Sequence, residues 1–389
     1  MIAYDKVWLA NLRLQAELKK DKLKGFINDA EFKAIAEKYP VGFYTPGLFA
    51  RIGLFILTCV VISFGDGLLT LFFAASDLSF TFGWMFFMGL LTYIALEFMV
   101  KTKHHYRSGI DDALLFISGL LFAVGFTMLF SHYNNVYYLP VAGAIFIFNL
   151  YFSVRFADMF MTAMCCFAFL AFVFFGWTKN ISFGMATIPF AMMLVSGVLY
   201  SLSYVYNKQK KFADYQNCFI ITQVIFLLVL YLAGNYYVVQ TLSDEISSRP
   251  GGAIPFGAFF WIWTMVLPFV YVGFGIRQKD VILLRTGLLL IVAAVITFRT
   301  YYHVLPLDTA LTIGGALILG IAYAIMKYLK TPKHGFTYAE PDDTNFMDHL
   351  KVESLIVAET FAKAPAAPAN DHIRFGGGDS GGGGSSGDF

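Results

Sequence analysis

The stretch Asp280–Lys330 reads DVILLRTGLLLIVAAVITFRTYYHVLPLDTALTIGGALILGIAYAIMKYLK. It holds two apolar runs, each long enough to cross roughly 30 Å of hydrocarbon, with a short aromatic turn between them. This pattern predicts a helix that spans a membrane and a second helix that returns to the first side. Three charged residues, Arg285, Arg299 and Asp308, lie in or beside these runs, where an unpaired charge is costly.

Two earlier segments repeat the pattern of the first run. Arg51–Phe64 reads RIGLFILTCVVISF, and Arg285–Phe298 reads RTGLLLIVAAVITF. Asp112–Phe130, DALLFISGLLFAVGFTMLF, aligns without a gap with the run that begins at Asp280. The constant offset suggests a parallel repeat of helix pairs, as some transporters have. Chance similarity between apolar sequences is the alternative.

The composition places most of the chain in lipid. Of 389 residues, 58% are hydrophobic and 14% are charged, and the mean hydropathy is +0.65. Soluble domains are roughly 45–50% apolar and 25% charged. We therefore predict an all-α polytopic integral membrane protein whose first partner is the lipid bilayer. A net charge of +2 is too small to predict binding of nucleic acid.

Ten apolar runs of spanning length follow the first 46 residues. They are Leu48–Leu71, Phe80–Val100, Asp112–Phe130, Leu139–Val154, Asp158–Trp177, Phe183–Tyr206, Cys218–Val239, Ile254–Ile276, Val281–Phe298 and Leu305–Tyr328. The fourth and fifth runs are short, and only residues 155–157 separate them. A broken helix or a re-entrant pair is therefore the alternative to two full spans there.

Lysine and arginine gather in alternate connections. Those that follow the even-numbered runs carry Lys101, Lys103, Arg107, Arg155, Lys208, Lys210, Lys211, Arg277 and Lys279. The other connections carry only Lys179, Arg249 and Arg299. Cations favour the cytoplasmic side of a membrane. The pattern predicts a multi-pass protein of a cell inner membrane with both termini in the cytoplasm.

Soluble segments flank the spans and complete three predicted domains: residues 1–46, 47–330 and 331–389. The first is predicted to be a helical hairpin, because Gly25 is a helix stop and Asn28 with Glu31 forms a capping-box pattern. The last has one short amphipathic helix over residues 345–362 and a Gly/Ser-rich end that is predicted to be disordered. We call residues 1–46 the headpiece.

Several charges near the span ends have structural explanations. Glu97 can pair with Lys101 one turn later. Asp111, Asp112 and Asp280 lie where helices begin, and Asp158 either does the same or pairs with Arg155. These are favourable positions for carboxylates, so no function is needed to account for them.

A second set of polar residues forms the candidate site: Asp66, Arg285, Arg299, Tyr301, Tyr302, His303 and Asp308. Asp66 falls about 22 Å beyond Arg51 along a helix, in the outer leaflet. Arg285 can extend its charge back to the interface, and Arg299 and Asp308 can pair across the aromatic turn. In a transporter these residues form a gate or proton relay; otherwise they form an interfacial clasp. A position near one membrane face favours the clasp.

The sequence carries no motif that predicts catalysis. The string G-D-S-G-G at residues 378–382 resembles a protease signature, but a glycine tail has no oxyanion hole. His104 and His105 have no partners at metal-ligand spacing. The four cysteines lie inside apolar runs and are expected to pack as small apolar side chains. We predict no catalytic residue, metal or cofactor.

The headpiece and the first run carry a family resemblance. LKGFINDAEFKAIAEKYP (Leu23–Pro40) and FYTPGLFARIGLFILT (Phe43–Thr58) resemble the start of a group of bacterial polytopic membrane proteins, the domain-of-unknown-function family 2157. The resemblance covers residues 1 to 70, and the later spans are similar only in hydropathy. It implies the same membrane fold but no chemistry, and therefore no functional residue.

These observations lead to one functional expectation and two alternatives. The first is a non-enzymatic membrane component that recruits a protein partner through its cytoplasmic headpiece or tail. The second is a secondary transporter that uses the membrane-embedded Asp and Arg residues. The third, a membrane enzyme acting on lipid-linked substrates, needs a cluster of His, Asp or Glu at one interface, and the histidines are scattered.

Overall fold

The computed structural model describes residues 2–73, 81–132, 135–246 and 254–302, with single positions between 309 and 327. The described residues form α1 Lys6–Leu23, α2 Asp29–Lys38, α3 Leu48–Phe72, α4 Phe82–Lys101, α5 Ile110–Leu129, β1 Ser131–His132, β2 Asn135–Val136, α6 Tyr138–Phe156, α7 Met159–Asn180, α8 Gly184–Asn207, a 3₁₀-helix Lys210–Tyr215, α9 Gln216–Gly234, α10 Tyr236–Ile246, α11 Gly257–Gln278 and α12 Val281–Tyr301. The two strands pair antiparallel.

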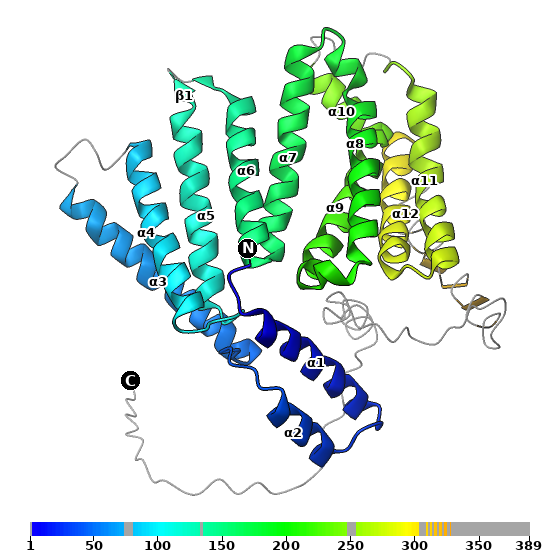
Figure 1. Ribbon diagram of the computed structural model, residues 1–389. Coiled ribbons are helices and arrows are strands. Elements are labelled where there is room, and N and C mark those ends of the chain that lie inside the picture. Colours follow the sequence, from blue (N-terminus) through cyan, green and yellow to red (C-terminus); the bar gives the residue numbers. More distant parts are fainter. Residues whose placement is uncertain are drawn as a thin grey trace, which may run out of the picture. The chain divides into compact units, whose positions relative to one another are not determined.

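The fold is the predicted all-α membrane bundle. Across the described residues, nine helices are long and apolar enough to cross a membrane: α3 to α9, α11 and α12. The pairs α4/α5, α6/α7, α8/α9 and α11/α12 pack as neighbours, and α3 packs on α5 (Figure 1). The prediction of many spanning helices is therefore confirmed. The tenth predicted span, Leu305–Tyr328, lies for the most part outside the described residues.

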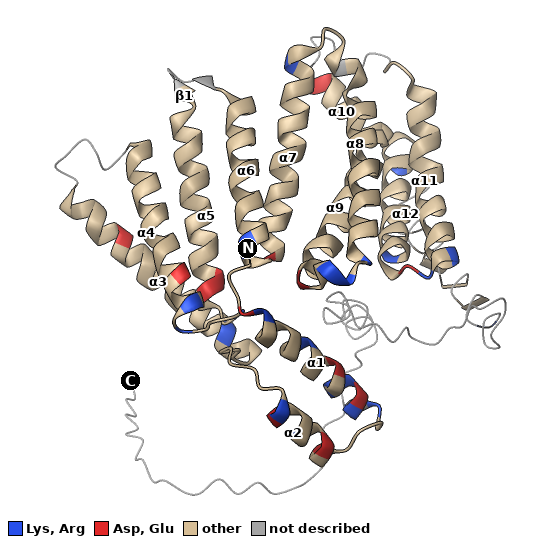
Figure 2. Cartoon of the chain, in the orientation of Figure 1, with Lys and Arg blue, Asp and Glu red and all other residues tan. Residues whose placement is uncertain are grey.

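The two ends of the spanning helices differ in charge. One end, which we call the headpiece side, receives the headpiece and includes the connections at 102–109, 157–158, 208–215 and 279–280. The other end, the far side, includes the described residues of three further connections: 130–132 with 135–137, 181–183, and 235–246 with 254–256. Charged residues of the bundle gather at the headpiece side in Figure 2. The structure thus sorts the cations as the alternating connections predict.

The fourth and fifth spans are two separate helices. α6 has 19 residues and α7 has 22, so neither is a half-helix of a re-entrant pair. Ala157 reverses the chain in the left-handed region, with φ 48° and ψ 40°. The side chain of Asp158 then caps α7 by accepting a hydrogen bond from the Met161 amide, at 2.8 Å. One left-handed residue and one N-cap are therefore enough to turn the chain between two full spans.

The same turn occurs between α11 and α12. Lys279 is left-handed, with φ 57° and ψ 35°, and Asp280 caps α12 through the amides of Ile282 and Leu283. An arginine lies three residues before each aspartate, Arg155 in one turn and Arg277 in the other. The sequence match paired Asp280 with Asp112, which is the third residue of α5 rather than its cap. When the two turns are compared, Asp280 corresponds to Asp158, because each is the N-cap after a left-handed residue.

The seventh predicted span ends earlier than its apolar run. The run was expected to continue to Val239, but α9 stops at Gly234 and α10 begins at Tyr236. Between them Asn235 has an extended backbone, with φ −72° and ψ 125°. The Asn235 side-chain oxygen accepts a hydrogen bond from the Val238 backbone amide, at 3.2 Å. The expected end of the seventh span at Val239 was wrong, because the apolar run continues through the break between α9 and α10.

The headpiece forms the predicted hairpin of α1 and α2. Gly25 has φ +78° in the turn, and Asn28 and Glu31 make both bonds of a capping box. The Asn11 side-chain amide donates to the Pro40 carbonyl at 2.8 Å and fixes the segment after α2 against α1. The Trp8 ring packs so closely on Gly42 that a Cβ there would collide with it. The predicted tail, residues 331–389, lies outside the described residues.

Candidate functional site

Asp66 lies in α3, the most exposed of the spanning helices. No residue of α3 is classed as buried, and Asp66 itself is half-buried. The backbone carbonyl of Asp66 accepts the Thr70 hydroxyl at 2.7 Å, and the Thr70 hydroxyl accepts the Trp84 indole N–H at 3.1 Å. A Cβ at Gly65 or Gly67 would meet nothing within 4 Å. Asp66 is thus a carboxylate on an open helix face, near one contact to α4.

Arg285 and Arg299 lie at opposite ends of α12. Arg285 is half-buried in the second turn, close to the headpiece side, and Arg299 is in the last turn on the far side. One guanidinium nitrogen of Arg299 is buried and has no hydrogen-bond partner within the part of the chain that the structure describes. Its predicted partner Asp308 lies outside that part, as does His303, so the ion pair stays a prediction.

Tyr301 and Tyr302 belong to a cluster of rings on the far side. Tyr301 packs edge-on against Tyr236, at 5.1 Å between ring centroids, and against Trp261, at 5.5 Å. Tyr302 stacks on Phe298 at 4.9 Å. Rings of this kind at the ends of spans form the aromatic belts of membrane interfaces. This geometry favours the clasp over the gate for these two tyrosines.

The candidate residues do not form one site. Asp66 is on α3, which packs on α5 at one side of the bundle, whereas α12 packs with α9 and α11 at the other side (Figure 1). Arg285 is separated from Arg299 by most of the length of α12. Sequence position alone suggested one cluster, because all but Arg285 were expected near the same membrane face. The lateral order of the helices separates Asp66 from the others.

A buried polar cluster supports the break between α9 and α10. The Asn235 side-chain amide donates to the Tyr231 hydroxyl at 3.0 Å and to the Thr297 hydroxyl at 3.1 Å. The Tyr236 amide donates to the Thr264 hydroxyl at 2.9 Å. Tyr231 and Thr264 are fully buried and Asn235 nearly so. These side chains satisfy the backbone groups that the break exposes, as irregular backbone at membrane depth requires.

A charged network links α4 and α6 toward the headpiece side. Arg155 donates from Nε to Glu97 Oε1 at 2.9 Å and from a terminal nitrogen to Glu97 Oε2 at 3.0 Å. Lys101 Nζ lies 2.7 Å from the same Oε2. The Tyr93 hydroxyl donates to Glu97 Oε1 at 2.8 Å and lies 2.7 Å from the Tyr151 hydroxyl. We call these five residues the Glu97 cluster.

The expected pairing of Glu97 with Lys101 is confirmed, and the alternative pairing of Asp158 with Arg155 is wrong. Arg155 turns instead to Glu97, 58 residues earlier in the chain, because α4 and α6 approach each other on this side. The Tyr93 ring stacks on Phe152, with centroids 5.8 Å apart and planes within 8°. Sequence spacing predicts pairs within one helix, but not this pair between two helices.

A second network closes the loop between α4 and α5. Asp111 accepts the backbone amides of Arg107, at 2.7 Å, and Ser108, at 2.8 Å, and also the Ser108 hydroxyl. His105 Nδ1 lies 2.8 Å from the Ser108 hydroxyl oxygen. Because the Ser108 hydroxyl donates its hydrogen to Asp111, His105 Nδ1–H donates to the Ser108 oxygen. Burial lowers the pKa of His105, while the charge of Asp111 opposes that change. Asp111 thus organises this loop.

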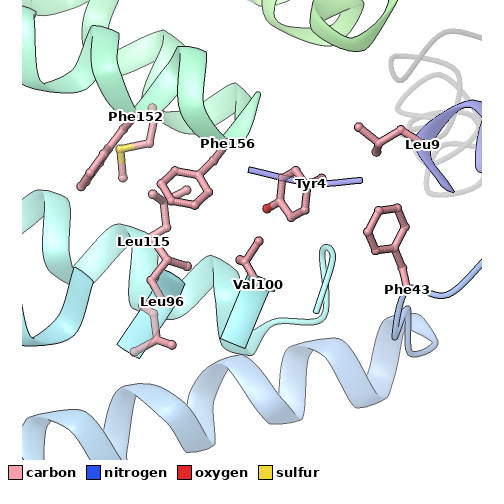
Figure 3. Close-up of a cluster of buried hydrophobic side chains, with 10 residues drawn as sticks. Tyr4, Leu9, Phe43, Leu96, Val100, Leu115, Phe152 and Phe156 are labelled. Carbon is pink, nitrogen blue, oxygen red and sulfur yellow. The ribbon is translucent and has the colours of Figure 1, made fainter. Parts of the chain in front are cut away.

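The start of the chain is seated on this side of the bundle. The Ala3 amide donates to the Arg155 carbonyl at 2.8 Å. The Tyr4 ring then inserts between Phe156 and Phe43, as Figure 3 shows. Tyr4 is only 9% exposed, and burial raises the pKa of its phenol well above the usual value. Ala3 and Tyr4 are therefore fixed to the bundle, and the Tyr4 ring is part of its core.

Further contacts hold the rest of the headpiece. Arg13 on α1 pairs with Asp214 at 2.9 Å, and the Tyr44 amide donates to the His104 carbonyl at 3.0 Å. The Trp8 ring packs edge-on against His104 at 4.9 Å. Residue spacing did not predict these contacts between the headpiece and the bundle. The aromatic residues Tyr4, Trp8 and Phe43 around the headpiece were the available signal, since a solvated hairpin has no need of them.

The described residues include no group of three or more His, Cys, Asp or Glu side chains that could hold a metal ion. Cys165, Cys166 and Cys218 are buried, as expected for packing residues, and each thiol lies within 3.9 Å of a carbonyl or hydroxyl oxygen. A shallow pocket of about 240 Å³ on the far side is lined by Tyr137, Tyr138, Leu139, Pro140, Phe175, Thr178 and Lys179. It contains none of the predicted site residues.

The fold and these networks define a class: a multi-pass, all-helical membrane protein with a structured headpiece fixed to one end of its bundle. Comparison of the chain with family models, with curated proteins and with solved structures finds no match. The resemblance of the headpiece to domain-of-unknown-function family 2157 therefore stays a prediction.

Proposed function

We propose that this protein is a non-enzymatic component of a cell inner membrane that recruits a protein partner through its headpiece, with the tail as a second recruiting segment. The observation that carries the proposal is the seat of the headpiece. A flexible basic segment next to the first span can bind a membrane surface by charge alone, without contacts to the bundle. Here Tyr4, Trp8 and Arg13 all contact the bundle. Such a seat holds the hairpin in one orientation.

The outer part of the hairpin is available to a partner. No residue of α2 is buried, and the Phe26 side chain at the tip of the hairpin is 75% exposed. A rigidly held module with exposed apolar side chains loses little conformational entropy when it binds. This arrangement supports recruitment more directly than it supports a solvated cap.

The cations support an orientation with the headpiece in the cytoplasm. The headpiece side carries the lysines and arginines of four connections, among them Lys103, whereas Lys179 is on the far side. Cations near span ends favour the cytoplasmic side. The test uses Lys103→Cys and Lys179→Cys in intact cells with a membrane-impermeant thiol reagent. We expect labelling only at position 179; labelling at position 103 would reverse the orientation.

Recruitment is tested with a photo-reactive residue at Phe26 in the full chain in its native membrane. The control position is Phe183 on the far side, an aromatic residue with a similar exposed fraction, 78%. We expect a discrete adduct from position 26 and none from position 183. Adding Tyr4→Ala, which removes the buried anchor, is expected to reduce the adduct. Equal adducts at both positions, or none at position 26, would refute the proposal.

The alternative is a secondary transporter, and Asp66 is the observation that favours it. A half-buried carboxylate between two glycines in a spanning helix is a functional-site hypothesis by default. Reconstituted wild-type protein would then show solute-dependent proton uptake into vesicles, and Asp66→Asn would abolish it. Asp29→Asn serves as the control, since the Asp29 side chain is 76% exposed in the headpiece, outside the spanning helices.

A further inference from the structure

The Glu97 cluster combines more positive charge than its carboxylate neutralises. Lys101 and Arg155 both contact the same oxygen, Glu97 Oε2, at 2.7 Å and 3.0 Å. One carboxylate shared by two cations leaves a net positive charge within the cluster. The Glu97 and Arg155 side chains are only 15% and 21% exposed, so water screens this charge incompletely. An anion beside the cluster would be stabilised.

The cluster is open on one side. The Lys101 side chain is 58% exposed and Tyr151 is 48% exposed, whereas Glu97 lies behind them. The Lys101 ammonium is a hydrogen-bond donor, and the Tyr151 hydroxyl, which donates to the Tyr93 hydroxyl here, can turn its hydrogen to an anion instead. An anion that approaches from outside therefore meets two donors first. The half-buried guanidinium of Arg155 supports them electrostatically from behind.

Apolar side chains extend from this open side along both helices. On α4 the exposed residues follow a helical stripe that ends at Lys101: Phe87, Leu91, Ile94 and Phe98. On α6 the exposed residues Ile147 and Leu150 precede Tyr151 in the same way. From Phe87 to Lys101 the stripe rises about 21 Å, more than the depth of one leaflet, roughly 15 Å. A donor pair at the end of an apolar stripe matches a phospholipid.

We infer that the Glu97 cluster binds an anionic phospholipid of the leaflet on the headpiece side, with the phosphate at Lys101 and Tyr151 and the acyl chains along α4 and α6. Basic pockets between spanning helices recognise anionic headgroups in this way. The apolar stripe distinguishes a lipid from a soluble phosphate, because only the lipid covers it. The inference does not rest on the proposed recruitment by the headpiece.

The test measures lipid retained by the purified full chain in native mass spectrometry. The probes are phosphatidylglycerol and phosphatidylcholine with the same acyl chains, and glycerol phosphate as a soluble competitor. Wild-type protein is expected to retain phosphatidylglycerol in preference to phosphatidylcholine. Lys101→Gln is expected to weaken this retention about fivefold, the loss of one lysine–anionic lipid interaction. Tyr151→Phe is expected to weaken it about twofold.

Lys103→Gln is the matched control. Lys103 is an exposed lysine two residues farther on, so its removal changes the surrounding field by the same charge. Its retention of phosphatidylglycerol is expected to equal that of the wild type. Equal losses in Lys101→Gln and Lys103→Gln would show attraction by the surface alone and overturn the site. Unchanged retention in Lys101→Gln, or displacement of the lipid by glycerol phosphate, would also overturn it.

Folding of each variant is checked by helical circular dichroism and thermal unfolding. Lys101 and Tyr151 are both on the surface, so neither substitution removes a core side chain. Were Lys101→Gln to fail to fold, Tyr151→Phe, which keeps the ring and every charge, would decide the question. Wild-type retention by Tyr151→Phe would then count against the site.

Discussion

Arg51, in the first turn of α3, donates from Nε and from a terminal nitrogen to Asp112 Oδ2 in α5, at 2.9 Å and 2.7 Å, across 61 residues of chain. The Asp112 side chain is 12% exposed and that of Arg51 is 40% exposed. α3 has no buried residue of its own. The ion pair therefore fixes the headpiece end of a helix that otherwise faces lipid along most of its length.

The two sides of this pair are expected to respond differently to mutation. Arg51→Gln leaves the Asp112 carboxylate buried without its cation and is expected to cost about 2–4 kcal/mol. Asp112→Asn leaves Arg51, which can turn toward water, and is expected to cost about 0.5–1 kcal/mol. Equilibrium unfolding of the full chain in detergent measures both. The double variant gives the coupling free energy, and a value of zero would contradict the structural role of the pair.

Gly109 is required where the loop after α4 approaches α3. It has φ +94°, and a Cβ at this position would overlap the Arg51 carbonyl oxygen. Gly109→Ala is therefore expected to displace the loop and lower the free energy of unfolding by about 2 kcal/mol or more. Gly53→Ala in α3 is the control, since its Cβ would meet nothing within 4 Å. That change is expected to be neutral or to stabilise by about 0.5 kcal/mol. Similar losses in both variants would refute this reading.

His105 is expected to make stability depend on pH. In the unfolded chain its pKa is about 6.5, and in the folded protein burial lowers the pKa. Between these two values the unfolded state binds more protons, so stability falls as the pH drops below about 6.5. We expect a lower melting temperature at about pH 5.5 than at about pH 7.5. His105→Gln is expected to reduce that difference.

The control for this experiment is His104→Gln. His104 packs on the Trp8 ring but makes no bond to the Ser108 hydroxyl that holds His105. The difference between the two pH values is expected to remain in this variant. If His105→Gln keeps the full difference, another group is responsible for it.

Asn235 is expected to decide where α9 ends. Asn235→Ala removes hydrogen bonds to Tyr231, Thr297 and the Val238 amide, all on buried or half-buried groups. The expected cost is about 2–3 kcal/mol, with faster amide exchange in α10. Thr300→Ala is the control, because its exposed hydroxyl donates to the Ile296 carbonyl of its own helix, at 3.0 Å. A loss below about 0.5 kcal/mol for Asn235→Ala would contradict a structural role.

Local signals in the sequence predicted local features of the structure. The capping box of Asn28 and Glu31 and the turn at Gly25 were read from residue type and spacing, and both are present. The cap at Asp280 and the pair of Glu97 with Lys101 were predicted in the same way. Each depends on atoms within about four residues of chain, so the sequence is sufficient.

Features that depend on which helices are neighbours could not be predicted from residue type and spacing. Apolar length predicted where α6 and α7 would lie, but not that the left-handed Ala157 would separate them. It also predicted that the seventh span continues past Asn235, whereas polar side chains of α11 and α12 stabilise a break between α9 and α10 there. The candidate site combined Asp66 with residues of α12 because depth in the membrane can be estimated from sequence, whereas lateral position cannot.

The sequence by itself indicated that most of this chain lies in lipid, that many of its segments can span a membrane, and that its cations gather at one end of the spans. These follow from hydropathy and charge, which are properties of the residues alone. Only the tertiary structure decided that Arg51 finds Asp112, that Arg155 turns to Glu97 and that Tyr4 is buried beneath the headpiece. Those contacts join segments far apart in the chain, and their partners are fixed by how helices pack side by side.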